Sequence, residues 1–231
     1  MTIAATFGLA AAVGVLLATL WIGVRRDDAA IAVNAVASLA AVASPLAVEA
    51  VVVGLEGGAV SFGPVLPLSI AIAGILHMLG MLGWYDTVWW WDHVTHVASA
   101  ALVAAIVYAW VVVAGPGALP GPLGTSVATA TIGLTLAAGI AWELLEHAAR
   151  AVSERVGVEH VLKRYGPYDT PMDVAFDGLG AILVVAVDGR MFLPLFEPTP
   201  AVTRTLLHWS IGAVTAISIG SAAVALVGRR L

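Results

Sequence analysis

The sequence lacks several residue types, and each absence narrows the chemistry. It contains no cysteine, so disulfides, thiolate nucleophiles and cysteine-ligated zinc or iron–sulfur centres are excluded. Any metal site must therefore use histidine, aspartate or glutamate. Charge is also scarce, because only 11% of the residues are charged and Lys163 is the single lysine. The net charge of −5 argues against a nucleic-acid partner, which requires a basic surface.

Apolar residues, in contrast, make up 61% of the 231 residues. A water-soluble core of this size cannot bury that much apolar surface, so the chain must contact the lipid bilayer. With about 20 apolar residues per span, the sequence predicts an all-α, polytopic transmembrane helix bundle of about seven helices, forming a single domain over residues 1–231. The expected helices cover residues 2–24, 29–53, 65–83, 92–114, 125–149, 171–189 and 201–227.

The basic residues predict the orientation of the bundle. If the helices alternate in direction, eight of the ten basic residues lie on one side, and Arg190 and Arg204 lie on the other. The eight are Arg25, Arg26, Arg150, Arg155, Lys163, Arg164, Arg229 and Arg230. The positive-inside rule then places the N-terminus outside and the C-terminus in the cytoplasm of a multi-pass cell-membrane protein. A retinal Schiff base is excluded, because the only lysine lies in a loop.

Four of the expected helices carry an ionisable side chain at nearly the same depth. His77, His96, Glu143 and Asp177 lie five to seven residues from the cytoplasmic helix ends, which is roughly 8–10 Å at the rise of an α-helix. Charged groups inside a bilayer are costly, and they are usually paired, metal-bound or functional. We therefore expect a polar site close to the cytoplasmic face.

The segment WYDTVWWWDHVTH, residues 84–96, leads into one of these helices. Its tryptophans are typical of an aromatic belt at the membrane interface. Asp92 and His96 are four residues apart and His93 and His96 are three apart, so on a helix each pair shares a face. His93 therefore has two readings, as a ligand or as an interfacial side chain.

The same spacing recurs in two later helices. Glu143 shares a face with Glu146 and His147, and the aspartates at 169, 173 and 177 form one stripe. We expect four residues to hold one or two divalent ions, namely His96, Glu143, Glu146 and Asp177. Carboxylate and imidazole ligands suit zinc, magnesium, manganese or iron. Asp92 and His147 are expected to orient ligands or to act as the general base.

Two further candidate ligands have structural alternatives. Thr170, Pro171 and Asp173 form a helix-start pattern in which Thr170 is the N-cap and Asp173 reaches back in a capping box. Asp173 is thus a cap or a ligand. His77 is alone on its helix and is either a hydrogen-bonded core histidine or a ligand.

The order of these motifs resembles the VanZ-like and YjdF-like membrane protein families over residues 84–190. The resemblance rests on Asp92-x-x-x-His96, on WELLEH at residues 142–147, and on the aspartate stripe that ends at Asp177 before Gly178 and Gly180. Asp177 stands where VanZ-like members usually carry asparagine. The resemblance implies a membrane protein. Within these families, VanZ itself is associated with resistance to a lipoglycopeptide antibiotic.

Three functions fit the sequence. The first is a metal-dependent membrane hydrolase or lipid-modifying enzyme that acts on a lipid-linked or amphiphilic substrate. The second is a non-catalytic accessory or structural protein, whose buried polar network holds the helices together. The third is a transporter or ion conduit, although the polar layer lies away from the midplane and no inverted repeat is evident.

Overall fold

A computed structural model describes residues 2–56, 61–157, 160–162, 166 and 168–228 of the protein. This part of the chain contains helices and turns but no strand, which confirms the all-α expectation. The chain divides into two compact units, Met1–Thr95 (unit 1) and His96–Leu231 (unit 2), with the boundary inside one helix. The division into two compact units does not test the expected single domain over residues 1–231, which stays a prediction.

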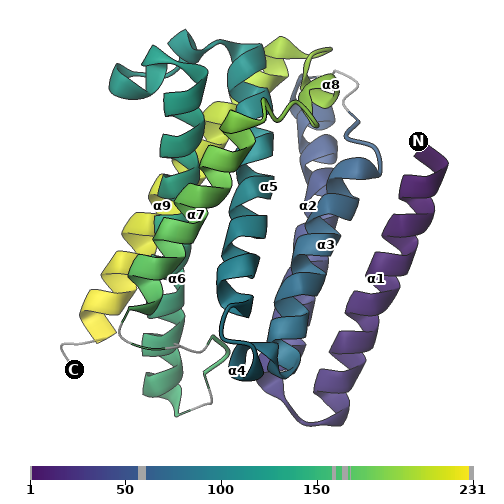
Figure 1. Ribbon diagram of the computed structural model, residues 1–231, viewed down its shortest axis with the longest axis vertical. Helices are drawn as coiled ribbons and strands as arrows, with labels where there is room; N and C mark the ends of the chain where they lie inside the picture. Colours follow the sequence, from purple (N-terminus) through teal and green to yellow (C-terminus); the bar gives the residue numbers. More distant parts are fainter. Residues whose placement is uncertain (1, 57–60, 158–159, 163–165, 167, 229–231) are drawn as a thin grey trace. The chain divides into compact units, whose positions relative to one another are not determined.

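Unit 1 is built around three long helices that pack against one another in pairs (Figure 1). Its elements are α1 (Thr2–Arg25), α2 (Ala29–Glu56), α3 (Val65–Leu79), a π-helical turn η1 (Gly80–Trp84) and α4 (Tyr85–Thr87). Leu16 of α1, Ala35 of α2 and Met78 of α3 are fully buried in a shared apolar core. Apolar side chains on all three helices therefore hold this unit together.

The π-helical turn carries the third span further than the sequence suggested. Residues 84–91 were expected to separate two helices, but the apolar span continues past a kink at Gly83, which has a non-helical conformation, to the short helix α4, which ends at Thr87. Gly83 has φ of 123°, which side chains rarely adopt. Gly80 is also required, because a Cβ there would overlap the ring of Tyr85. The two glycines thus let the chain kink after α3 and pack the Tyr85 ring against Gly80.

Unit 2 contains the other long helices (Figure 1). Its elements are α5 (Trp91–Ala114, shared at its start with unit 1), the 3-10 turns η2 (Pro116–Ala118) and η3 (Gly121–Thr125), α6 (Val127–Val156), α7 (Asp169–Ala186), α8 (Leu193–Phe196) and α9 (Pro200–Gly228). α6 packs against both α7 and α9. Ser126 caps α6 through its side chain, and Gly157 ends it in the left-handed conformation.

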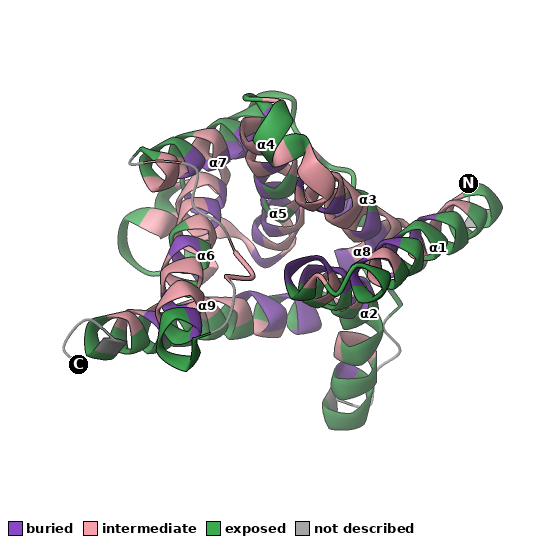
Figure 2. Cartoon of the chain, turned by 90° about the horizontal axis from the view of Figure 1, so that it is seen from below, coloured by how far each residue is buried: buried purple, intermediate pink, exposed green. Residues whose placement is uncertain are grey.

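Six helices in the described part of the chain are long and apolar enough to cross a membrane. Figure 2 shows exposed residues along these helices. Many of them are large and apolar, as expected of surfaces that face lipid. The expected count of about seven spans was one too high by this criterion. α7 is the difference, since Asp169, Asp173 and Asp177 make it too polar, although its bounds lie close to those expected.

The other predicted helices agree with the observed bounds to within a few residues, apart from the C-terminal extension of α6 from residue 149 to Val156. The predicted orientation is a different matter. Four of the basic residues on which it depends, Lys163, Arg164, Arg229 and Arg230, lie outside the described residues. The outside N-terminus and cytoplasmic C-terminus therefore stay predictions.

Candidate metal site

His96 of α5 lies between two aspartates of α7, all within unit 2. Its Nδ1 is 3.1 Å from Oδ1 of Asp177, and its Nε2 is 3.5 Å from Oδ1 of Asp173. Asp173 and Asp177 are buried, at 4% and 6% exposure. The histidine therefore joins two carboxylates that are one helical turn apart on the same face of α7.

A third helix adds Glu143 to this group. One ligand atom each of His96, Glu143 and Asp173 can be chosen so that all three atoms lie within 4.8 Å of one another. Glu143 is 4% exposed, and its Oε1 has no hydrogen-bond partner among the described residues. Helices α5, α6 and α7 thus converge on one point, which we call the acidic cluster (His96, Glu143, Asp173 and Asp177).

Two glycines make this convergence sterically possible. A Cβ on Gly139 of α6 would overlap Oδ2 of Asp177, so the missing side chain leaves the space that this carboxylate fills. A Cβ on Gly180 of α7 would lie 2.6 Å from the carbonyl oxygen of Val97 and 2.9 Å from the amide of Ala101. Helices α5 and α7 therefore approach at backbone distance beside the cluster.

The hydrogen bond to Asp177 fixes which nitrogen of His96 can act as a ligand. In the neutral imidazole that donates from Nδ1 to the Asp177 carboxylate, Nε2 keeps its lone pair and is available as a ligand. Two ligands of a tetrahedral ion at ~2.1 Å are roughly 3.4 Å apart. The separation of 3.5 Å between His96 Nε2 and Asp173 Oδ1 matches that spacing. This spacing is compatible with a histidine ligand that a second carboxylate orients.

The predicted capping box at the start of α7 is wrong. The helix begins at Asp169, and its N-cap residue, Tyr168, forms no capping hydrogen bond through its side chain. The hydroxyl of Thr170 has no hydrogen-bond partner in the part of the chain that the structure describes. Asp173 is the fifth residue of the helix, too far in to cap it, and its carboxylate lies beside His96 instead.

Glu146, an expected ligand, is engaged on its own helix. Its Oε1 accepts a hydrogen bond of 2.9 Å from Nε1 of Trp142, and its Oε2 accepts one of 3.0 Å from Nη1 of Arg150. Glu146 is not in the group of three ligand atoms.

His147 holds the backbone next to the cluster. Its Nδ1 is 2.7 Å from the carbonyl oxygen of Glu143, so Nδ1 carries a proton and donates a hydrogen bond to that oxygen. Because this nitrogen carries a proton, it cannot accept a hydrogen bond from the guanidinium of Arg150, whose Nη2 lies 3.2 Å away. The expected role of His147 as a base would have to use Nε2, and it stays a prediction.

His77 lies in unit 1 and is hydrogen-bonded on both ring nitrogens. Nε2 is 3.0 Å from Oδ1 of Asn34, and Nδ1 is 2.9 Å from the hydroxyl of Tyr85. That hydroxyl donates onward to Thr95, which donates to the carbonyl oxygen of Asp92. Of the two interpretations of His77, a hydrogen-bonded core histidine is the one that matches its contacts within unit 1.

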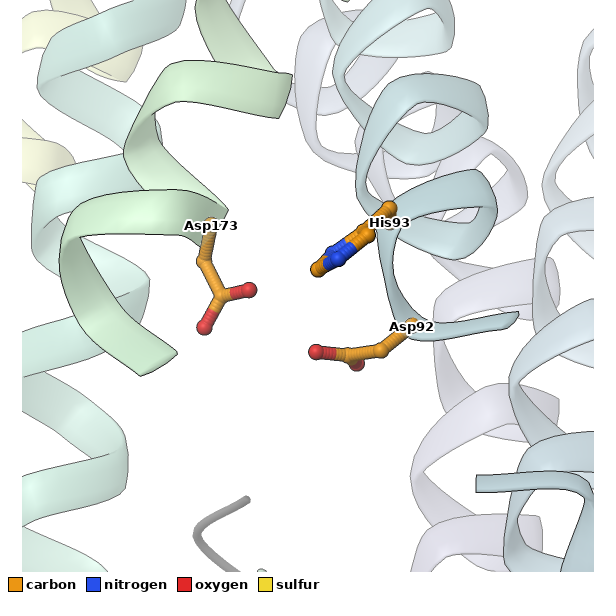
Figure 3. Close-up of side chains that lie close together, drawn as sticks. All are labelled: Asp92, His93 and Asp173. Atoms are coloured by element: carbon orange, nitrogen blue, oxygen red, sulfur yellow. The ribbon is translucent and has the colours of Figure 1, made fainter. Parts of the chain in front are cut away.

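Asp92 and His93 project from the first turn of α5, and Asp173 projects from α7 (Figure 3). The ring of His93 lies edge-to-face with Trp89, whose side chain is 83% exposed. Trp91 is buried and donates from Nε1 to the carbonyl oxygen of Leu76. The aromatic segment thus contains one exposed tryptophan, Trp89, and one that is buried in unit 1, Trp91. The role expected for Asp92 stays a prediction.

Sequence reasoning missed the residues that make room for the cluster or satisfy its neighbours. Gly139 stands four residues before Glu143, and this helical spacing was a usable signal. Asn34 and Tyr85 were not singled out, because a single amide or hydroxyl in an apolar helix has no distinctive pattern. Their partnership with His77 joins residues 43 and 8 positions apart in the chain.

Comparison with known proteins identifies a family for most of the chain. Residues 7–193 match the family described as predicted membrane protein (DUF2238), and the chain belongs to that family. No curated protein and no solved structure matches the chain. The match supports a membrane protein family, while the finer resemblance to VanZ-like proteins stays an expectation.

Proposed function

We propose that this protein is a membrane-embedded, metal-dependent enzyme in which His96, Glu143 and Asp173 hold a divalent ion. Asp177 orients His96 in this proposal and is not itself a ligand. The observation that carries the proposal is the convergence of these three ligand atoms within 4.8 Å, from three different helices of unit 2.

The charge of the acidic cluster supports a bound cation. Glu143, Asp173 and Asp177 are each at most 6% exposed. In the described part of the chain, the arginine that lies on the same stretch of α6, Arg150, forms its salt bridge with Glu146 instead. Buried carboxylates need a counter-ion or a proton, and a divalent ion neutralises two of them at once.

The ligand set narrows the identity of the ion. One imidazole nitrogen with two carboxylates is a mixed set, and imidazole ligands favour zinc or iron over magnesium and calcium. Manganese also fits, since it accepts both ligand types. We therefore propose zinc, iron(II) or manganese, and place magnesium last among the four ions that the sequence suggested.

Three protein ligands leave a coordination position for water or substrate, which is the arrangement of catalytic rather than structural zinc sites. An ion held in this way activates a bound water or polarises an ester or phosphoryl oxygen. His96 is the sixth residue of α5 and Asp173 the fifth of α7, so the site lies about 6–8 Å along each helix from its start. This shallow position suits the head group of a lipid-linked or amphiphilic substrate.

The remaining parts of the proposal concern proton transfer and location. His147, through Nε2, is the proposed proton-transferring group of unit 2, and the general-base role of Asp92 stays an expectation from the sequence. The protein is proposed to reside in the cell membrane with the site at the cytoplasmic face, as the distribution of basic residues predicts.

Elemental analysis of the purified protein tests the proposal first. We expect about one equivalent of a transition metal in the wild type and loss of that metal in D173N. D169N is the matched control, because Asp169 lies on the same helix outside the group of three and should leave the metal in place. A wild-type protein that stays free of metal after incubation with zinc, iron(II) and manganese would overturn the proposal.

Turnover then separates an enzyme from a scaffold. The metal-loaded protein is incubated in bilayers with short-chain lipid phosphates and lipid esters, and product release is measured. Release that disappears in D173N and persists in D169N supports the enzyme. A full metal content without turnover of either substrate would instead favour the accessory protein, whose metal site locks α5, α6 and α7 together.

A further inference from the structure

A second set of polar groups lies on α6, apart from the acidic cluster. Thr131 and Thr135 are 0% and 2% exposed, and neither hydroxyl has a hydrogen-bond partner among the described residues. The indole nitrogen of Trp110, on α5 of the same unit, is also buried and without a partner there. These two hydroxyls on α6 and the indole N–H on α5 therefore bond nothing in the described part of the chain.

Other threonines in the same unit show that these hydroxyls are unusual. A threonine in a membrane helix normally bonds the carbonyl oxygen four residues earlier. Thr203 of α9, also 0% exposed, bonds the carbonyl oxygens of Thr199 and Phe196, and Thr205 bonds that of Ala201. A hydroxyl that forgoes this bond inside a bilayer loses free energy unless another partner replaces it, and ordered water is the usual replacement.

The spacing along α6 fits a series of bridging waters. Thr131, Thr135 and Gly139 are successive positions four residues apart, so each step is about 6 Å along the helix. One water that bonds two groups at ~2.8 Å each spans about 5.6 Å. The series ends at Asp177, whose Oδ2 fills the space beside Gly139.

We propose that unit 2 binds a file of water molecules along α6, from Asp177 past Thr135 to Thr131. Thr131 is the fifth residue of the helix, so the file reaches from the acidic cluster nearly to the N-terminal end of α6, where Ser126 and Thr129 carry exposed hydroxyls. The ligand is water, and the file gives water, and protons that hop along it, a route to the cluster through the bilayer. The inference is independent of whether the cluster binds a metal.

Water-edited solid-state NMR of the protein in lipid bilayers tests the file directly. Threonine is labelled with ¹³C, and the transfer of magnetisation from water to each threonine side chain is timed. T131S and T135S assign the two signals, because each removes one labelled threonine while it keeps the hydroxyl.

The expected result is that Thr131 and Thr135 build up severalfold faster than Thr203, at a rate close to that of the exposed Thr129. Thr203 is the internal control, since it is as buried as Thr131 and its hydroxyl has hydrogen-bond partners. Buildup at Thr131 and Thr135 as slow as at Thr203 would overturn the proposal, whatever the metal content of the sample.

Discussion

Units 1 and 2 both bury polar side chains between apolar helices, but they satisfy them differently. In unit 1 the buried groups are uncharged or weakly basic, and they bond one another in a chain from Asn34 through His77 and Tyr85 to Thr95. In unit 2 three carboxylates surround one histidine, and Oε1 of Glu143 has no hydrogen-bond partner in the described chain.

The difference separates two uses of polarity inside a membrane. A network whose donors and acceptors match one another orders the helices that carry it. A cluster with more buried negative charge than its neighbours neutralise is stable only with an added cation or proton. Unit 1 therefore has the features of a scaffold, and unit 2 has those of a binding site.

Replacing one histidine in each unit gives the largest expected contrast. H96A should lower metal affinity by at least about 100-fold, because it removes the nitrogen ligand and leaves Asp177 without its partner. H77A should leave metal content unchanged and destabilise the protein, since Asn34 and Tyr85 each lose a hydrogen bond. Elemental analysis and thermal unfolding measure both effects, and equal metal loss in the two variants would contradict the division of roles.

A glycine substitution tests whether Asp177 must reach His96. G139A adds no charge and removes no ligand, but its Cβ displaces the Asp177 carboxylate. We expect metal affinity to fall by about 10–100-fold, as for other losses of a ligand-orienting partner. G212A is the matched control on α9, where a Cβ meets nothing within 4 Å. Unchanged affinity in G139A would remove Asp177 from the site.

Backbone contact between α5 and α7 should matter more for stability than for chemistry. G180A places a Cβ 2.6 Å from the carbonyl oxygen of Val97, so one helix must move, and we expect a loss of about 1–3 kcal/mol in the free energy of unfolding. In G178A the new Cβ meets only the flexible end of Leu136 at 3.4 Å, and its unfolding temperature should match the wild type. Equal unfolding temperatures for the two variants would argue against the close approach.

The smallest expected effect is at the other end of unit 2. Hydrogen bonds from Arg190 and then from Tyr108 lower the pKa of Asp188, so the stability they provide is present at neutral pH and is lost as the pH falls through the lowered value. D188N keeps the backbone, because asparagine tolerates the positive φ of this position. Below about pH 4, the unfolding temperature of D188N should fall less than that of the wild type. The unfolding temperature of T95V, a variant in unit 1, should fall as much as that of the wild type.

Much of the fold was predictable, because helix length and apolar composition are local properties. The start of α7 was not, since the pattern Thr170-Pro171-x-Asp173 satisfies a capping box and a ligand site equally well. Only the approach of α5 through Gly180 places Asp173 beside His96. Spacing also could not distinguish Glu143 from Glu146, which lie three residues apart on one helix and differ in which partners reach them.

That last pair provides the most direct test of the central claim that the acidic cluster binds a divalent metal ion. The metal content of E143Q and E146Q is measured after identical purification and incubation with zinc. Both substitutions keep the size of the side chain, remove one charge and lie on the same helix. The account predicts that E143Q loses the metal and that E146Q retains it, because the carboxylate of Glu146 in the wild type bonds Trp142 and Arg150 instead. Retention in E143Q with loss in E146Q, or equal metal content in both, would contradict it.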